Sequence, residues 1–370
     1  MGIYHIIFFI IFISGFVSTF TKVNKYYSIV IFFILAIFGS LRYKIGMDYE
    51  SYENIFNSIS DDPTSIFNAS GEVYVEPGYA LVISCLKSIG LNNIGIFAFH
   101  ILITLIFFYK AIIKYSVDSF LSWNIFYGVY YANLLFNGMR QGLFIAIILL
   151  VFPRLLKRDL NSFLKMLFLS VFLAFFVHKT ALMLPIFYFF CLFEPKMKYK
   201  IYLLIFMLIW AFSGVGKILV EVGGLAFFKD TAYLSVVDFY TQSEAFGKEL
   251  KFFSITVLHR IVILVLALYF SQFKSSSPLF RQLSNIYFWG AIIYLFLTPM
   301  GYILATRVSM NLKIFEVTLL PFFIPFLKES YFKLIGFLII SLWSFAVMLT
   351  NFYLPGNYPY YIPYRTILEK

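Results

Sequence analysis

Four arginines border or interrupt apolar stretches of this sequence. Arg42 closes one stretch, Arg140 opens another and is followed by Gln141, Arg260 lies within a third, and Arg307 precedes a fourth. A guanidinium at the centre of a membrane helix costs at least about 2.5 kcal/mol, so it usually faces protein or water and has a partner. Its planar fork suits two oxygens of a phosphate or carboxylate. The arginines therefore predict binding of an anionic group, with snorkelling to lipid headgroups as the alternative for each.

The segment from Arg42 to Tyr52 carries a second set of polar residues. Gly46 allows a tight turn, and Asp48 either pairs with a nearby arginine or accepts a proton from a sugar hydroxyl. Tyr49 and Tyr52 offer flat faces and hydroxyls that suit carbohydrate, although anchoring at the membrane interface explains them equally well. This segment is therefore a candidate for substrate contact.

Other ionisable residues stand between or inside apolar runs. Glu76 is a candidate base or a partner for an arginine, and His178 with Lys179 lies between two apolar segments. A histidine there either shuttles a proton, hydrogen-bonds an anion, or is satisfied by backbone groups at a helix end. Lys313 and Glu316 are three residues apart, which places them on one helix face and predicts an ion pair.

The composition indicates which elements must position these residues. The chain is 61% hydrophobic and only 13% charged, which predicts an all-α polytopic membrane protein. At about 17 to 25 apolar residues per span, we expect about twelve transmembrane helices with extracytoplasmic loops between them. Their expected ranges are 3–20, 26–41, 93–110, 119–138, 140–153, 162–177, 179–193, 201–216, 252–272, 283–300, 308–326 and 334–352.

Loops that follow the odd-numbered spans share one side of the membrane and are rich in basic residues, which predicts that this side is cytoplasmic. These residues are Lys22, Lys25, Lys110, Lys114, Arg154, Lys157, Arg158, Lys165, Lys196, Lys198, Lys200, Lys274, Arg281, Lys328 and Lys333. The formal net charge of +11 is then an insertion signal, and we expect no nucleic-acid partner. Both termini are expected outside.

The simplest expected organisation is one integral membrane domain over residues 1–370. Its opposite face carries the long segments: an extracytoplasmic loop over 42–92, a second over 217–251 and a tail over 353–370. Within the first loop, Pro77 opens an apolar run too short to span the membrane, which predicts a short interfacial helix.

Several kinds of catalytic site have no motif in the sequence. Cys85 and Cys191 lie in distant segments, and the four histidines show no metal-ligand spacing. A serine-hydrolase elbow, a phosphate-cradling glycine loop and an acidic metal cluster are also missing. We therefore expect no metal and no cofactor, and we expect catalysis to rest on electrostatics and acid–base chemistry.

Short motifs along nearly the whole chain, in this order, resemble those of EpsG-like, Wzy-type polysaccharide polymerases of bacterial envelopes. The motifs are Arg42 to Tyr52 with Gly46-Met47-Asp48-Tyr49, Glu76-Pro77-Gly78-Tyr79, Met139-Arg140-Gln141, His178-Lys179-Thr180-Ala181-Leu182, Arg307, and Pro363-Tyr364-Arg365. Met47 departs from the pattern, because the family often has a small polar residue there.

The resemblance implies a metal-independent glycosyltransferase that joins undecaprenyl-pyrophosphate-linked oligosaccharide repeat units. It would act within membrane lipid at the outer leaflet of the bacterial inner membrane, with its site facing the periplasm or cell exterior. A chain-length regulator or flippase of the same pathway is a possible partner.

On this reading Arg140, Arg260 and Arg307 hold the pyrophosphate, and Arg42 with Asp48 orders the first outer loop. Gln141, Lys179, Tyr49 and Tyr52 are further candidates for substrate binding. The base that deprotonates the acceptor hydroxyl is Asp48, Glu76 or His178.

Three other functions remain open from the sequence. A ligase of the O-antigen ligase kind would use the same donor and a similar arginine set, with a different acceptor. A lipid-linked oligosaccharide transporter would place polar residues through the membrane midplane. A structural subunit of an export complex would tolerate alanine at the outer arginines.

Overall fold

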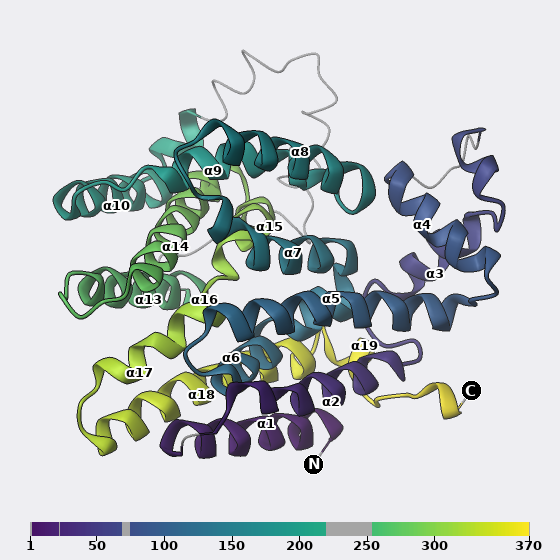
Figure 1. The fold of residues 1–370 in the computed structure, drawn as a ribbon, viewed down its shortest axis with the longest axis horizontal. Coiled ribbons are helices and arrows are strands. Elements are labelled where there is room, and N and C mark those ends of the chain that lie inside the picture. Colours follow the sequence, from purple (N-terminus) through teal and green to yellow (C-terminus); the bar gives the residue numbers. More distant parts are fainter. Residues whose placement is uncertain (1, 22, 69–74, 220–253, 370) are drawn as a thin grey trace. The chain divides into compact units, whose positions relative to one another are not determined.

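A computed structural model of the chain describes residues 2–21, 23–68, 75–219 and 254–369. Within these ranges the regular structure is entirely helical, apart from one isolated antiparallel bridge between Arg42 and Thr366 (Figure 1). The all-α class expected from composition is confirmed. The expected loop over 217–251 falls almost wholly outside the described residues.

The chain divides into two compact units, each described here by itself. The first comprises residues 1–185 and 317–370, and the second comprises residues 186–316. The expectation of a single membrane domain stays a prediction.

The first unit contains most of the helices. They are α1 (Ile3–Phe20), η1 (Lys25–Ser28), α2 (Ile29–Ser40), α3 (Tyr49–Ser58), η2 (Pro63–Asn68), α4 (Pro77–Ser88), α5 (Asn93–Tyr115), α6 (Ser119–Ile125), η3 (Phe126–Asn137), α7 (Met139–Leu155), α8 (Leu160–Phe176), η4 (Lys179–Met183), η6 (Leu320–Phe322), α17 (Phe323–Phe326), α18 (Ser330–Tyr353), α19 (Tyr358–Tyr361) and η7 (Ile367–Glu369).

The second unit contains α10 (Met197–Phe212), α13 (Ile255–Ser271), α14 (Pro278–Leu297), η5 (Thr298–Met300) and α15 (Tyr302–Lys313). The boundaries between the units fall within α9 (Leu184–Leu192) and α16 (Glu316–Leu319). Within the second unit, α14 packs against α10, α13 and α15.

Local sequence explains where several of these helices begin. The side chains of Asn92, Asp118, Asp159 and Ser277 each accept a hydrogen bond from a backbone N–H in the first turn of the following helix. Such caps satisfy donors that have no partner inside the helix. Pro77 stands at the first position of α4, where its missing N–H costs nothing.

Among the residues that the structure describes, four helices are long and apolar enough to cross a membrane. They are α1, α5, α18 and the segment Pro278–Met300. A fifth candidate is the bent pair Tyr302–Lys313 and Glu316–Phe326. Several of the other expected spans coincide with shorter helices, such as α8 and α13. The protein is therefore a helical membrane protein, and the count of about twelve spans stays a prediction.

The buried centre of the first unit is the continuous helix formed by α6 and η3. All of Ser119–Ile125 and nearly all of η3 are buried, and α1, α18 and α7 pack around them (Figure 1). We expected an ordinary helix over 119–138, whereas η3 is a π-helix, a wider form that is rarely so long. The side-chain amide of Asn351 donates to the carbonyls of Gly128 and Val129 in this helix.

The segment between α2 and α5 is more structured than the sequence indicated. Besides α4, it contains α3, which we did not predict. The tail after α18 returns to the start of this segment: the Tyr43 N–H donates to the Arg365 carbonyl at 3.0 Å, and the Ile367 N–H donates to the Leu41 carbonyl at 2.9 Å. The C-terminal tail is therefore held against the start of this segment.

Candidate functional site

Arg140 and Glu76 form an ion pair between Nη1 and Oε2. Arg140 is the second residue of α7, and Glu76 immediately precedes α4. Of the two alternatives for Glu76, that of arginine partner is confirmed. The Glu76 side chain is only 4% exposed, whereas that of Arg140 is 19% exposed, so the guanidinium keeps an accessible edge.

The same carboxylate also contacts the His178-Lys179 motif. The backbone N–H of Lys179 donates to Glu76 Oε1 at 3.1 Å, which joins the His178-Lys179 turn to α4 and α7. The Lys179 side chain itself is exposed. Glu76 therefore uses both oxygens to hold together three segments that are far apart in the sequence.

His178 caps the short helix η4. Its Nδ1 accepts from the Thr180 N–H at 3.3 Å and lies 2.8 Å from the Thr180 hydroxyl. The helix-end alternative thus applies in part, with a backbone amide as the partner instead of a carbonyl. Because Nδ1 accepts a hydrogen bond, a neutral imidazole carries its proton on Nε2.

Two buried tyrosines border Arg140. The Tyr52 hydroxyl accepts from the Arg140 backbone N–H at 3.2 Å, and the Tyr79 ring lies 5.7 Å from the guanidinium. Burial raises the pKa of Tyr52, so its phenol stays neutral. The Tyr79 hydroxyl is buried and has no hydrogen-bond partner among the described residues.

Arg42 is buried in the first unit. Its Nη1 donates to the carbonyls of Ile45 and Phe136 at 2.8 and 2.9 Å, and the Phe136 ring lies 4.7 Å from its guanidinium. It is 2% exposed and has no carboxylate partner in the part of the chain that the structure describes. Arg42 therefore orders the turn after α2, and in this structure it offers no surface to a substrate.

The Tyr49 ring is also inaccessible. It is 2% exposed and stacks on Phe97, with ring centroids 4.5 Å apart. Tyr52 is similarly buried, at 5% exposed. Neither ring presents its face to a carbohydrate or to the membrane interface, because tertiary packing has covered both.

Asp48, by contrast, is partly exposed. It precedes α3 without capping it through its side chain. Its charge contributes to the environment of Tyr361: burial raises the pKa of that phenol to about 12, Asn137 and Arg42 oppose the rise, and the Asp48 carboxylate adds to it. Gln141, in the first turn of α7, is half-buried.

Two motif glycines make the close approaches in this network possible. Gly46 has a φ of 111°, and a Cβ there would lie 2.6 Å from the Phe136 carbonyl oxygen. At Gly78, a Cβ would lie 2.8 Å from the Phe175 carbonyl oxygen and closer still to the rings of Phe175 and Phe176. The first lets the turn reach η3, and the second lets α4 approach α8.

Asn137 is a site residue that the sequence analysis did not assign. Its Oδ1 accepts from the Met47 N–H at 2.9 Å, and its Nδ2 donates to the Tyr361 hydroxyl at 2.7 Å. It thereby joins the first motif to the C-terminal tail. Its position before Gly138, where η3 ends and α7 begins, was the only signal in the sequence.

The remaining arginines belong to the second unit. Arg260 is 4% exposed on α13, where Nη1 donates to Ser309 Oγ at 3.1 Å and the guanidinium lies 3.9 Å from the centroid of Tyr294. Arg307 is exposed and lies inside α15, whereas we expected it ahead of a helix. The convergence of these two arginines with Arg140 stays a prediction.

The expected Lys313–Glu316 ion pair is confirmed. Nζ lies 2.9 Å from Oε1, and the Tyr287 hydroxyl donates to Oε2 at 3.3 Å. We placed this pair within one helix, but it bridges the end of α15 and the start of α16. Glu316 is fully buried, so the pair stabilises a break between two helices.

The apolar helices, and a polar network assembled from separated motifs, define a polytopic membrane protein with a candidate anion-binding site. Residues 24–366 match the EpsG family model, so the chain belongs to the EpsG family, and the resemblance inferred from its motifs is confirmed. This makes it a membrane protein of polysaccharide biosynthesis. No curated protein and no solved structure matches the chain.

Proposed function

We propose that this protein is a polysaccharide polymerase that joins undecaprenyl-pyrophosphate-linked oligosaccharide repeat units at the outer leaflet of the bacterial inner membrane. The observation that carries the proposal is the network of Arg140, Glu76 and the Lys179 backbone. It brings together motifs from three segments and leaves one edge of a guanidinium accessible.

Arg140 is the residue that would contact the pyrophosphate. Its Nη1 is held by Glu76, and the side chain remains 19% exposed. Negative charge develops on the leaving group as the transition state forms. A guanidinium fixed in this way therefore stabilises the transition state more than the bound substrate, which lowers the activation barrier. Lys179, whose backbone N–H donates to the same carboxylate, has an exposed side chain that adds a second positive charge.

In the proposed reaction, a hydroxyl oxygen of the acceptor unit attacks the anomeric carbon of the donor's lipid-proximal sugar. The bond from that carbon to the pyrophosphate oxygen breaks, a glycosidic bond forms, and undecaprenyl pyrophosphate leaves. A base takes the hydroxyl proton. The reaction involves no redox step.

Asp48 is our choice for this base. Glu76 already accepts from Arg140 and Lys179, and His178 accepts through Nδ1, so its ring acts as an acceptor within the chain. Asp48 is the partly exposed carboxylate of the three candidates. Arg42, Tyr49 and Tyr52 act as positioning residues in this scheme.

Reconstitution tests the proposal directly. Purified protein in liposomes would receive its lipid-linked repeat unit, and the products would be separated by size on a gel. We expect a ladder of polymers that persists when EDTA is present. A strict requirement for added metal would contradict the electrostatic mechanism.

The acceptor distinguishes the polymerase from the alternatives. A polymerase extends the product by whole repeat units with only lipid-linked units present. A ligase would need a different acceptor, and a transporter would move the lipid-linked unit across the bilayer without changing its length.

A further inference from the structure

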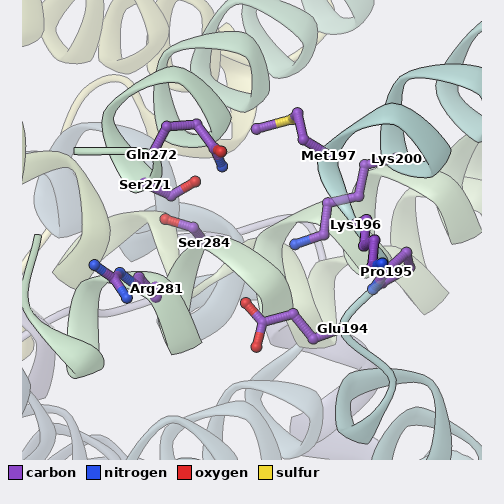
Figure 2. A pocket seen from close by; sticks show the side chains of 9 residues that line it. All are labelled: Glu194, Pro195, Lys196, Met197, Lys200, Ser271, Gln272, Arg281 and Ser284. Atoms are coloured by element: carbon purple, nitrogen blue, oxygen red, sulfur yellow. The ribbon is translucent and has the colours of Figure 1, made fainter. Parts of the chain in front are cut away.

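A pocket of about 480 Å³ lies in the second unit, and none of its lining residues belongs to the motifs used above. It is formed by the α9–α10 connection, the start of α10, the end of α13 and the start of α14 (Figure 2). Its charged lining residues are Lys196, Lys200, Arg281 and Glu194, three cations against one carboxylate. The sequence predicts that these loops face the cytoplasm.

Lys200 is the feature that distinguishes this pocket from an ordinary basic surface. The residue is 6% exposed, and its ammonium makes no hydrogen bond or ion pair with the described residues. The Phe288 ring lies 5.4 Å from Nζ, and Glu194 is the carboxylate that acts on this ammonium electrostatically. Figure 2 shows the side chain reaching from α10 toward Ser284 and Glu194. Glu194 is the one carboxylate that lines the pocket, against three cations, so a ligand that supplied an anion would stabilise this largely buried lysine.

The start of α10 adds a second source of positive potential. Lys196 stands at the N-cap position, but its side chain does not cap the helix. The first backbone N–H groups of this 16-residue helix therefore have no side-chain acceptor, and the helix dipole favours an anion beside them.

The α9–α10 connection is held in place by α14. The Asn285 side-chain amide donates to the carbonyls of Cys191 and Phe193 at 2.9 and 3.3 Å, and Trp289 Nε1 donates to the Phe193 carbonyl at 2.9 Å. The wall that carries Glu194 and Lys196 is thus fixed before any ligand arrives, which lowers the entropic cost of binding.

We propose that this pocket binds a phosphate group, with Lys200 as its central contact and with Lys196, Arg281 and the start of α10 around it. Phosphate carries enough oxygens to engage several donors at once, whereas a chloride ion cannot. The volume also admits more than a bare ion, so the phosphate belongs either to an anionic lipid headgroup or to a soluble phosphate or phosphate ester.

Variants of the full chain test this proposal, with Lys200→Met as the main one. Methionine keeps the apolar stem but removes the charge, and Lys200→Arg restores a cation. Lys198→Met is the matched control, because Lys198 is two residues away, exposed, and does not line the pocket. Glu194→Gln removes the opposing charge without removing a donor.

Two measurements identify the source of the phosphate. In detergent, thermal unfolding is followed while inorganic phosphate is titrated against sodium chloride at matched ionic strength. In nanodiscs of phosphatidylglycerol or phosphatidylcholine, native mass spectrometry counts the lipids that stay bound. Stabilisation by inorganic phosphate indicates a soluble ligand, and selective retention of phosphatidylglycerol indicates a headgroup.

In whichever measurement responds, we expect Lys200→Met to weaken binding roughly 10- to 100-fold, the effect of one lost charge-assisted hydrogen bond. Lys198→Met should bind like the wild type, Lys200→Arg should recover most of the affinity, and Glu194→Gln should bind more tightly. Equal losses at Lys198 and Lys200, or no response to either probe in folded wild-type protein, would overturn the proposal.

Discussion

At the residue scale, the most informative feature is the difference in exposure between Glu76 and Arg140. The carboxylate is 4% exposed and the guanidinium 19% exposed. Removing the arginine would leave a buried charge without its partner, whereas neutralising the carboxylate would leave a cation that water can reach. Glu76 is therefore a support for Arg140, and Arg140 is the member of the pair that can meet a ligand.

This asymmetry gives a prediction about stability. Arg140→Ala should destabilise the protein by about 3 kcal/mol, the lower end of the range for breaking a buried ion pair. Glu76→Gln should cost less, and the double variant should be more stable than Arg140→Ala alone. Thermal unfolding of the detergent-purified variants checks the order. Additive losses in the double variant would mean that the two residues are not coupled.

A second prediction concerns activity. Arg140→Lys keeps the charge but loses the fork that holds Glu76 and a phosphate oxygen together, so polymer synthesis should fall at least about 100-fold. Arg154→Lys, at the other end of the same helix and exposed, is the matched control. If both variants make normal amounts of polymer, Arg140 does not take part in the reaction.

At the scale of elements, the approach of α4 to α8 positions Glu76. Gly78 lies where a Cβ would collide with the backbone of Phe175. Backbone atoms cannot move aside as a flexible side chain can, so a larger residue must push the two helices apart.

Gly78→Ala should therefore lower the free energy of unfolding by about 1 to 3 kcal/mol, the usual cost of overpacking. It should also reduce polymer synthesis, because Glu76 precedes Pro77 and moves with α4. Gly356→Ala is the control, since a Cβ at Gly356 has nothing within 4 Å. Thermal unfolding and the gel assay measure the two effects. Wild-type behaviour of Gly78→Ala would refute the proposed constraint.

The ion pair between Lys313 and Glu316 makes a separate prediction at the break after α15. Glu316 is fully buried, so Lys313→Met should cost about 3 to 5 kcal/mol. Adding Glu316→Gln should recover part of the loss, because glutamine is neutral and can still accept from Tyr287. Lys328→Met, at an exposed position, should change little. Unfolding temperatures of the four proteins in detergent provide the comparison.

At the scale of the whole molecule, the arrangement of basic residues predicts orientation. In a variant without Cys85 and Cys191, a cysteine placed at Asp61 should react with a membrane-impermeant maleimide in intact cells. A cysteine at Lys198 should react only after the membrane is opened. Both native positions are exposed. The reverse pattern would place the candidate site in the cytoplasm, where an outer-leaflet polymerase cannot work.

Much of the fold could be predicted from sequence because it depends on local properties. Each of the twelve expected spans coincides with helix in the structure, and the Lys313–Glu316 pair follows from its spacing. The π-helical form of η3 and the existence of α3 were missed, because hydrophobic content alone does not report the width of a helix or the packing of a polar loop.

The candidate site was predicted as a set of residues but not as an arrangement. The sequence named Arg140 and Glu76, yet it left open whether Glu76 was a base or a partner. It treated Tyr49 as a possible carbohydrate platform, whereas packing on Phe97 covers the ring. Exposure depends on which distant segment covers a residue, and a single sequence does not specify that.

By itself, the sequence determined that this protein is helical, embedded in a membrane and a member of the EpsG family, since composition, apolar run length and ordered motifs are properties of the chain. Only the tertiary structure decided that Glu76 pairs with Arg140 across 64 positions, that Arg42 is buried under aromatic rings, and that the tail returns to the first loop. These contacts arise from long-range packing, in which the free energy of each residue depends on neighbours far away along the chain.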